Sequence, residues 1–183
     1  MVPVPHGADG LQPGRRGVRR ASLGGLLAAV LLFGLPAGAG PVNLQDVRSG
    51  KTVALEPGAP ALHVVFFATW CPPCVEELQR LVELKSRWGD GRYRLVLVAV
   101  QNRQSLAKLS GFLESRANLP GELLFDFEGQ AERQWKAGDL PTHVVLDAAG
   151  HEVARAAALD PQIEAAIRNL LQAGRGTGRG RTP

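Results

Sequence analysis

The chain is predicted to have an α/β fold, with a central mixed β-sheet flanked by helices and an added N-terminal β-hairpin. Apolar runs that are typical of buried strands alternate with segments of helical periodicity along most of the sequence. The hydrophobic fraction of 45% is enough for a substantial core. At 183 residues, the chain suits one domain of ordinary size with appendages at its ends.

The first 39 residues are typical of a targeting segment rather than of a folded domain. Four arginines between residues 15 and 20 precede an almost uncharged stretch of Leu, Ala, Val and Gly that runs to Gly40. Ala37-Gly38-Ala39 then offers a small-x-small pattern suited to signal peptidase. We expect a signal peptide over residues 1–39. An uncleaved membrane anchor is the alternative, because the apolar run is only slightly shorter than the ~20 residues that span a bilayer. Both place the domain outside the cytoplasm.

The residues that follow predict the hairpin and the first central strands. Alternating apolar and polar residues over 42–47 and 52–55 flank a turn, which is typical of two antiparallel strands. The run 62–67 predicts a buried strand, and the leucines after it recur at helical spacing as far as Trp88. The nearly continuous apolar run 93–100 predicts a second buried, parallel strand.

The second half of the chain predicts three more strands and three more helices. The strands are expected at 122–127, 143–146 and 151–157, and the helices after the N-cap Ser105, over 129–136, and after Asp160-Pro161. The predicted domain therefore covers residues 40–173. Residues 174–183 are rich in Gly and Arg, have no apolar side chain to bury, and are predicted to be a disordered tail.

The formal net charge of +4 belongs to the ends of the chain. Without the four N-terminal arginines, Asp9 and the three arginines of the tail, 14 basic residues face 16 acidic ones. The predicted domain is therefore near neutral and carries no basic stripe, so the sequence argues against nucleic acid as a partner.

The only two cysteines lie in the stretch Trp70-Cys71-Pro72-Pro73-Cys74, between a predicted strand and a predicted helix. A disulfide that spans two residues removes little entropy from the unfolded chain. It therefore stabilises a fold only weakly and is better suited to reversible oxidation and reduction. The thiolate is the reacting form, and a helix N-terminus favours it. We therefore expect Cys71 to attack a substrate and Cys74 to resolve the mixed disulfide. A static disulfide, a buried cysteine pair and a shared metal site are the alternatives.

In this setting the Trp-Cys-Pro-Pro-Cys motif resembles the thioredoxin superfamily, specifically its TlpA/ResA-like extracytoplasmic branch. The resemblance covers about residues 42–173 and implies a thioredoxin-like fold to which the hairpin is added. It implies that Leu140-Pro141, within Gly138-Asp139-Leu140-Pro141-Thr142, is the superfamily's cis-proline loop. That loop would face the cysteines, present the Leu140 backbone to an extended substrate and exclude a metal. An ordinary trans proline at the start of a strand is the alternative.

The resemblance also assigns roles to residues around the cysteines. Trp70 would cover one side of the disulfide, and Pro72 and Pro73 would tune its reduction potential and face the substrate. Glu77 stands three residues after Cys74, where the branch carries a glutamate near the active site, and it would exchange a proton with that thiol. A solvated helix face that Glu77 shares with Glu76 and Glu83 is the alternative.

Three positions depart from the superfamily or stay ambiguous. Val65 stands where cytoplasmic thioredoxins have a buried acid, and Gln79 stands where many relatives have a proline that kinks the helix. His143 follows Pro141 by two residues, nearer to the site than the other histidines. We expect His143 to be an ordinary strand histidine; a pH-active or metal-binding role is the alternative.

The resemblance implies an exported enzyme that reduces disulfides of protein substrates, including those of cytochrome c maturation. Electrons would come from a membrane thiol-transfer protein, with no cofactor beyond the redox-active disulfide Cys71–Cys74 and no metal. We expect a monomer. The alternatives are a dithiol oxidase that inserts disulfides and a non-catalytic module whose dithiol holds a metal or a partner.

Overall fold

The computed structural model describes residues 41–176 apart from residues 90 and 117. The predicted signal segment over residues 1–39 lies outside the described residues. The strands are β1 (Val42–Asp46), β2 (Thr52–Leu55), β3 (Ala61–Phe67), β4 (Tyr93–Val100), β5 (Glu122–Asp126), β6 (Thr142–Leu146) and β7 (Glu152–Ala156). The helices are α1 (Pro72–Trp88), α2 (Leu106–Glu114), α3 (Gln130–Gln134) and α4 (Pro161–Gly176). Their order is the one that the sequence predicted.

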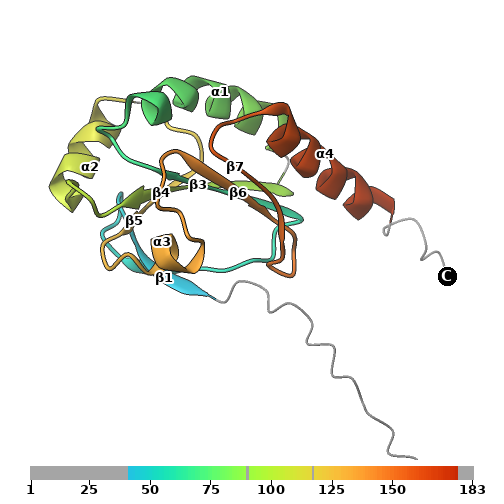
Figure 1. Cartoon of the computed structure of the whole chain (residues 1–183), viewed down its shortest axis with the longest axis horizontal. Helices are drawn as coiled ribbons and strands as arrows, with labels where there is room; N and C mark the ends of the chain where they lie inside the picture. Colours follow the sequence, from blue (N-terminus) through green and yellow to red (C-terminus); the bar gives the residue numbers. More distant parts are fainter. Residues whose placement is uncertain (1–40, 90, 117, 177–183) are drawn as a thin grey trace, which may run out of the picture. The chain divides into compact units, whose positions relative to one another are not determined.

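The seven strands form one mixed sheet in the order β2-β1-β5-β4-β3-β6-β7. The central strands β3, β4 and β5 are parallel, whereas β6 pairs antiparallel with β3, and β7 pairs antiparallel with β6 at the edge of the sheet. The hairpin of β1 and β2 extends the sheet at its other edge, because β1 pairs antiparallel with β5. This arrangement confirms the predicted thioredoxin-like fold with an added N-terminal hairpin (Figure 1).

Helices cover both faces of the sheet, with α1 and α4 on one face and α3 on the other (Figure 1). Side chains alternate between the faces along β3. His63 is hydrogen-bonded on the face below α1, while Phe66 packs against Trp135, which directly follows α3. All residues of β3 are buried, which explains why this strand is a nearly continuous apolar run.

The helix that begins after Cys71 is continuous from Pro72 to Trp88. Its buried side chains are Cys74, Leu78, Leu81 and Leu84, close to the predicted apolar stripe. Gln79 is exposed and does not interrupt the helix, so α1 has no break at the position where many relatives have proline.

The last helix extends further than the sequence predicted. Ile163, Ile167 and Leu171 give it a buried face, and the Asp160 carboxylate accepts a hydrogen bond from the Ile163 N–H at 2.9 Å. The helix ends at Gly176, so residues 174–176, assigned from the sequence to the disordered tail, are helical. The low helix propensity of glycine predicts helix ends only weakly, and three residues add easily to a helix that is already formed and packed through Leu171.

Candidate active site

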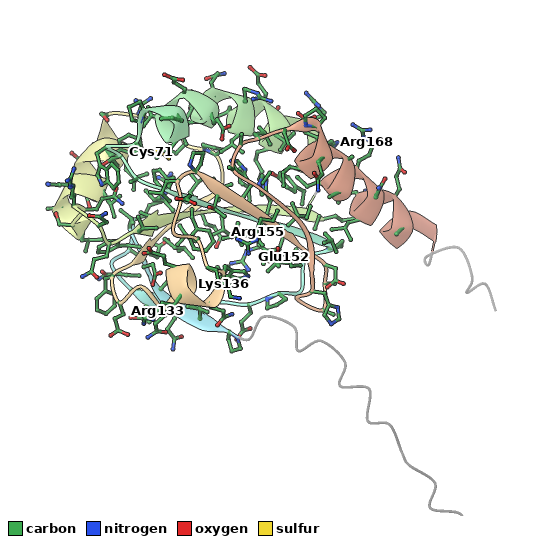
Figure 2. All side chains as sticks on the ribbon, in the orientation of Figure 1. Cys71, Arg133, Lys136, Glu152, Arg155 and Arg168 are labelled. Carbon is green, nitrogen blue, oxygen red and sulfur yellow. A yellow bond between two sulfur atoms is a disulfide. The ribbon has the colours of Figure 1, made fainter. Side chains whose placement is uncertain are left out.

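Cys71 lies at the beginning of α1 (Figure 2). It forms a disulfide with Cys74, and the two Cα atoms are 5.3 Å apart. Cys71 is the N-cap residue of the helix, and its Sγ accepts a hydrogen bond from the Cys74 N–H at 3.3 Å. Pro72 and Pro73 follow at the start of the helix, where the N–H that proline lacks would have no helical partner. The Cys71 sulfur therefore lies at the positive end of the helix dipole.

The loop that leads into Cys71 is held against the end of β4. The Gln104 side chain accepts a hydrogen bond from the Thr69 N–H at 2.9 Å and donates one to the Val100 carbonyl at 2.5 Å. The Trp70 indole N–H donates to the Asn102 carbonyl at 2.6 Å. Sequence reasoning missed Gln104, because this clamp joins residues 35 positions apart and leaves no local pattern.

An open hollow of about 280 Å³ lies beside the disulfide. It is lined by Trp70, Cys71, Pro72, Val100, Asn102, Glu132, Gly138, Asp139 and Leu140. Cys74 is not among these lining residues and is 2% exposed, so Cys71 is the sulfur that a substrate in the hollow meets first. The structure thus brings Trp70, Pro72 and Leu140 together around Cys71, while Pro73 lies outside the hollow.

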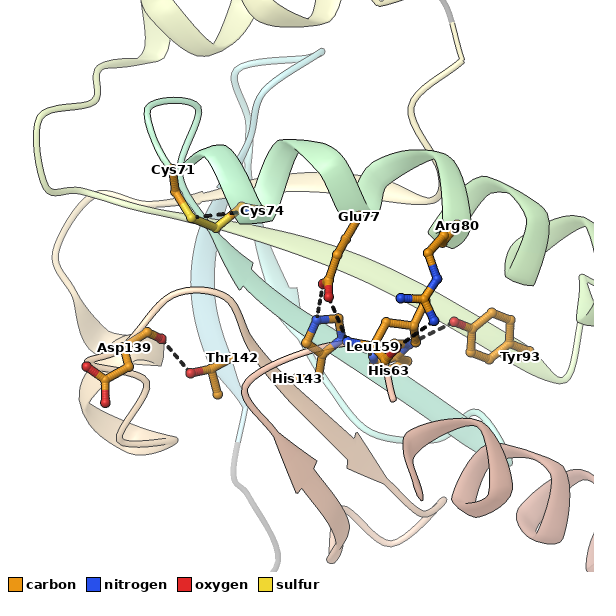
Figure 3. Close-up of polar contacts among 10 residues, drawn as sticks. All are labelled: His63, Cys71, Cys74, Glu77, Arg80, Tyr93, Asp139, Thr142, His143 and Leu159. Carbon is orange, nitrogen blue, oxygen red and sulfur yellow. Dashed lines mark hydrogen bonds and ion pairs between the residues drawn. A yellow bond between two sulfur atoms is a disulfide. The ribbon is translucent and has the colours of Figure 1, made fainter. Parts of the chain in front are cut away.

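The predicted cis-proline loop contributes Gly138, Asp139 and Leu140 to the lining of this hollow. The Leu140-Pro141 peptide bond is cis, as the resemblance implied. The Thr142 hydroxyl donates a hydrogen bond to the Asp139 carbonyl at 2.5 Å and closes the loop behind the proline (Figure 3). Leu140 lines the hollow and Pro141 does not.

Glu77 points from α1 toward the sheet, away from the exposed face that Glu76 and Glu83 share (Figure 3). Its side chain is 13% exposed. Oε2 accepts a hydrogen bond from His143 Nε2 at 2.8 Å, and Oε1 accepts one from the Leu159 N–H at 2.9 Å. Burial alone would raise the pKa of Glu77, but these two hydrogen bonds and the charges of His143 and Arg80 lower it below its ordinary value.

His143 belongs to a buried polar group that sequence reasoning did not identify. Its Nδ1 lies 3.0 Å from His63 Nε2, and His63 Nδ1 lies 2.8 Å from the Tyr93 hydroxyl. Both histidines are fully buried. His143 also pairs across the strands with Val65, the position at which cytoplasmic thioredoxins have their buried acid. The only sequence signal was two histidines inside otherwise apolar strands.

Two further kinds of feature are absent from residues 41–176, leaving out 90 and 117. No group of three or more His, Cys, Asp or Glu side chains is arranged there to hold a metal ion. None of the helices in this part of the chain combines the length and the apolar character that a bilayer crossing requires.

The fold, the cysteine pair and the family together define a thiol–disulfide oxidoreductase. The chain belongs to the AhpC/TSA family, whose model matches residues 30–154, more than half of its length. The Cys71–Cys74 pair is a Cys-x-x-Cys disulfide between β3 and α1. No curated protein sequence matches the chain significantly.

Solved structures show the same fold at low sequence identity. StoA from Bacillus subtilis is 18% identical with a TM-score of 0.60, over 72% of this chain and 97% of that one. The exposed lipoprotein thioredoxin of Streptococcus pneumoniae is 20% identical with a TM-score of 0.61, over 73% and 99%. A secreted Mycobacterium tuberculosis disulfide oxidoreductase homologous to Escherichia coli DsbE is 20% identical with a TM-score of 0.56, over 72% and 95%.

Proposed function

We propose that this chain is an exported reductase of protein disulfides. The observation that carries the proposal is the position of Cys71, which caps α1 and borders the hollow beside the cis-proline loop. A helix N-terminus stabilises negative charge, so the reduced Cys71 is the attacking thiolate. Cys74 is more deeply buried and is suited to the resolving step.

The reaction transfers two electrons from the dithiol to the substrate. The Cys71 thiolate attacks one sulfur of a substrate disulfide, whose S–S bond breaks, and its electron pair leaves on the other substrate sulfur. The Cys74 thiolate then attacks Cys71, which re-forms the Cys71–Cys74 bond and releases the second substrate thiolate. No bound cofactor takes part in this scheme.

Two sets of residues complete the proposed site. Trp70, Pro72 and Leu140 line the hollow and would contact an extended substrate chain, with Pro73 and Pro141 shaping the two loops. Glu77 would accept the Cys74 proton in the resolving step, because side chains three residues apart on a helix are neighbours.

The setting of the enzyme is also part of the proposal. The N-terminal sequence pattern supports export, and so does the likeness of the fold to proteins described as exposed or secreted. We propose that a membrane thiol-transfer protein supplies the electrons and that the enzyme acts as a monomer. The cysteines of apocytochrome c are the proposed substrates.

The test is the equilibrium reduction potential of the Cys71–Cys74 couple in glutathione or dithiothreitol buffers. We expect a value near or below about −250 mV, in the range of reductases. A value near about −120 mV would identify a dithiol oxidase and would remove the cytochrome assignment. Cys74→Ser should trap a mixed disulfide with substrate and Cys71→Ser should not. Stable binding of one metal ion per chain without thiol exchange would favour a non-catalytic module instead.

A further inference from the structure

Four polar side chains form a continuous buried chain of hydrogen bonds below α1, next to the disulfide (Figure 3). They are Tyr93 on β4, His63 on β3, His143 on β6 and Glu77 on α1, and we call them the Tyr93–Glu77 chain. Tyr93 is 1% exposed and the histidines are fully buried. Of the four side chains, only that of Glu77 is partly exposed, and it lies one helical turn beyond Cys74.

The register of β6 against β3 brings the members of the Tyr93–Glu77 chain together. His143 pairs with Val65 across the antiparallel strands, and Val65 lies two residues from His63 on the same face. In β3 and β6 the buried positions around the histidines are mostly apolar, and a buried polar group costs free energy unless it is hydrogen-bonded. All four ring nitrogens of the two histidines have a hydrogen-bond partner within the Tyr93–Glu77 chain, so no buried ring nitrogen is left without a hydrogen bond.

When Glu77 is ionised, both proton arrangements of the histidines leave it as an acceptor. A neutral imidazole has one donor and one acceptor nitrogen. When His143 is neutral and donates from Nε2 to Glu77, its Nδ1 accepts from His63, and His63 in turn accepts from the Tyr93 hydroxyl. When His143 carries both protons, the bond between the rings reverses, but Nε2 still donates to Glu77. Either arrangement stabilises the carboxylate.

We propose that Tyr93, His63 and His143 are positioning residues that hold Glu77 ionised and fixed in place, one helical turn from Cys74, as the acceptor of the proton of that thiol. This inference rests on the proposed function, in which Glu77 accepts the proton of Cys74. The side chains of Glu77 and Cys74 are neighbours on α1, three residues apart. Loss of the His143 hydrogen bond and charge would leave burial less opposed and so raise the pKa of Glu77 toward the neutral carboxyl group, which cannot accept a proton.

The step is balanced without any further reactant. As Cys74 attacks the Cys71 sulfur of the mixed disulfide, the Cys74 proton passes to Glu77. The Cys71–Cys74 bond forms, the bond from Cys71 to the substrate sulfur breaks, and its electron pair leaves on that sulfur.

The charged groups around the Tyr93–Glu77 chain come from two elements, α1 and α4. Arg80 of α1 and His143 of β6 influence Glu77 directly, as the Leu159 N–H does. At the far end, the Lys85 ammonium lies 5.6 Å from the centre of the Tyr93 ring, and Glu164 of α4 adds negative charge near the phenol. Burial and Glu164 raise the pKa of Tyr93, which therefore keeps its proton as the last donor.

The experiment follows the reaction of the reduced full chain with one equivalent of dithiobis(nitrobenzoate) by stopped-flow absorbance. The first coloured thiolate reports the attack by Cys71, and the second reports the intramolecular attack by Cys74. We expect His143→Leu to slow the second release at least about tenfold at pH 7 and to leave the first unchanged. In this variant the acid limb of the pH profile of the second release should move to higher pH.

Matched variants separate positioning from packing. His143→Gln keeps a donor for Glu77 and should restore most of the rate. Tyr93→Phe should move the acid limb of the pH profile of the second release in the same direction, but by less. This variant tests the role of the Tyr93–Glu77 chain if His143→Leu does not fold. His151→Leu, the same substitution at an exposed turn, should behave like the wild-type protein.

The outcomes distinguish this inference from the proposed function. Glu77→Gln should slow the second release, and the double variant with His143→Leu should be no slower, because His143 acts through Glu77. If Glu77→Gln is slow and His143→Leu retains the wild-type rate and pH profile, the positioning role is wrong and the role of Glu77 stands. If both variants are unaffected, Glu77 is not the proton acceptor. A wild-type chain that releases one thiolate and never a second would overturn dithiol exchange itself.

Discussion

At the scale of the residue, the unusual feature is a histidine pair in the core of the sheet. His63 has no water contact and faces Tyr93 from β4 and His143 from β6. Burial, and then the charge of His143, lower the pKa of His63 well below its ordinary value. The folded protein therefore keeps His63 neutral at a pH where an unfolded chain would bind a proton.

This difference predicts how stability depends on pH. Below about pH 6.5, the unfolded state binds a proton that folded His63 does not. The free energy of unfolding should therefore fall as the pH decreases from 7 to 5, with a limiting slope of ~1.4 kcal/mol per pH unit for one proton. Urea unfolding at a series of pH values measures the slope. His63→Leu should remove this component and His151→Leu should keep it. An equal slope in both variants would show that His63 is not its source.

At the scale of the element, two glycines have opposite roles. Gly121 precedes β5 with a φ of +74°, and a Cβ there would lie 2.1 Å from the Leu95 carbonyl oxygen on β4. Gly111 lies in the exposed face of α2, where a Cβ would meet nothing within 4 Å. The first glycine permits the close approach of β4 and β5, whereas the second only weakens a helix.

The same substitution should therefore change stability in opposite directions at these positions. Gly121→Ala is expected to lower the free energy of unfolding by roughly 2 kcal/mol or more, because the left-handed backbone and the close contact both resist a side chain. Gly111→Ala should raise it by about 0.5–1 kcal/mol through helix propensity. Urea unfolding monitored by tryptophan fluorescence compares them. A Gly121→Ala protein as stable as the wild type would contradict the contact with Leu95.

At the scale of the whole molecule, the redox state and the stability of the fold are linked. The disulfide joins residues three positions apart, so its loop is very short. Such a loop reduces the entropy of the unfolded chain by an amount worth about 2 kcal/mol. In a dithiol protein that acts as a strong oxidant, this difference in stability is reversed, because its reduced form is the more stable one.

The proposed reductase should thus be more stable when oxidised than when reduced, by roughly 2 kcal/mol. Urea unfolding with and without dithiothreitol measures the difference. A chain in which both cysteines are replaced by serine serves as the control and should not respond to the reductant. A reduced form more stable than the oxidised form would contradict the assignment as a reductase and would favour the oxidase.

The order of the elements and the cysteine pair could be predicted without the structure, because both are local patterns. Apolar runs marked the central strands, and β4 was predicted over the residues that it occupies. Strand, Cys-x-x-Cys and helix are contiguous, and the cis-proline loop is one short string. The end of α4 was missed, since glycine content is a weaker guide than the packing of Leu171.

The surroundings of Glu77 depended on tertiary structure. From the sequence, this carboxylate fitted a solvated helix face as well as a catalytic position, and His143 fitted an ordinary strand residue. The hydrogen-bonded neighbours in the Tyr93–Glu77 chain are 30, 80 and 66 residues apart in the sequence. Periodicity carries no information about such pairs. Only the register of β3 against β4 and β6 brings the ring nitrogens, the phenol and the carboxylate within hydrogen-bonding distance.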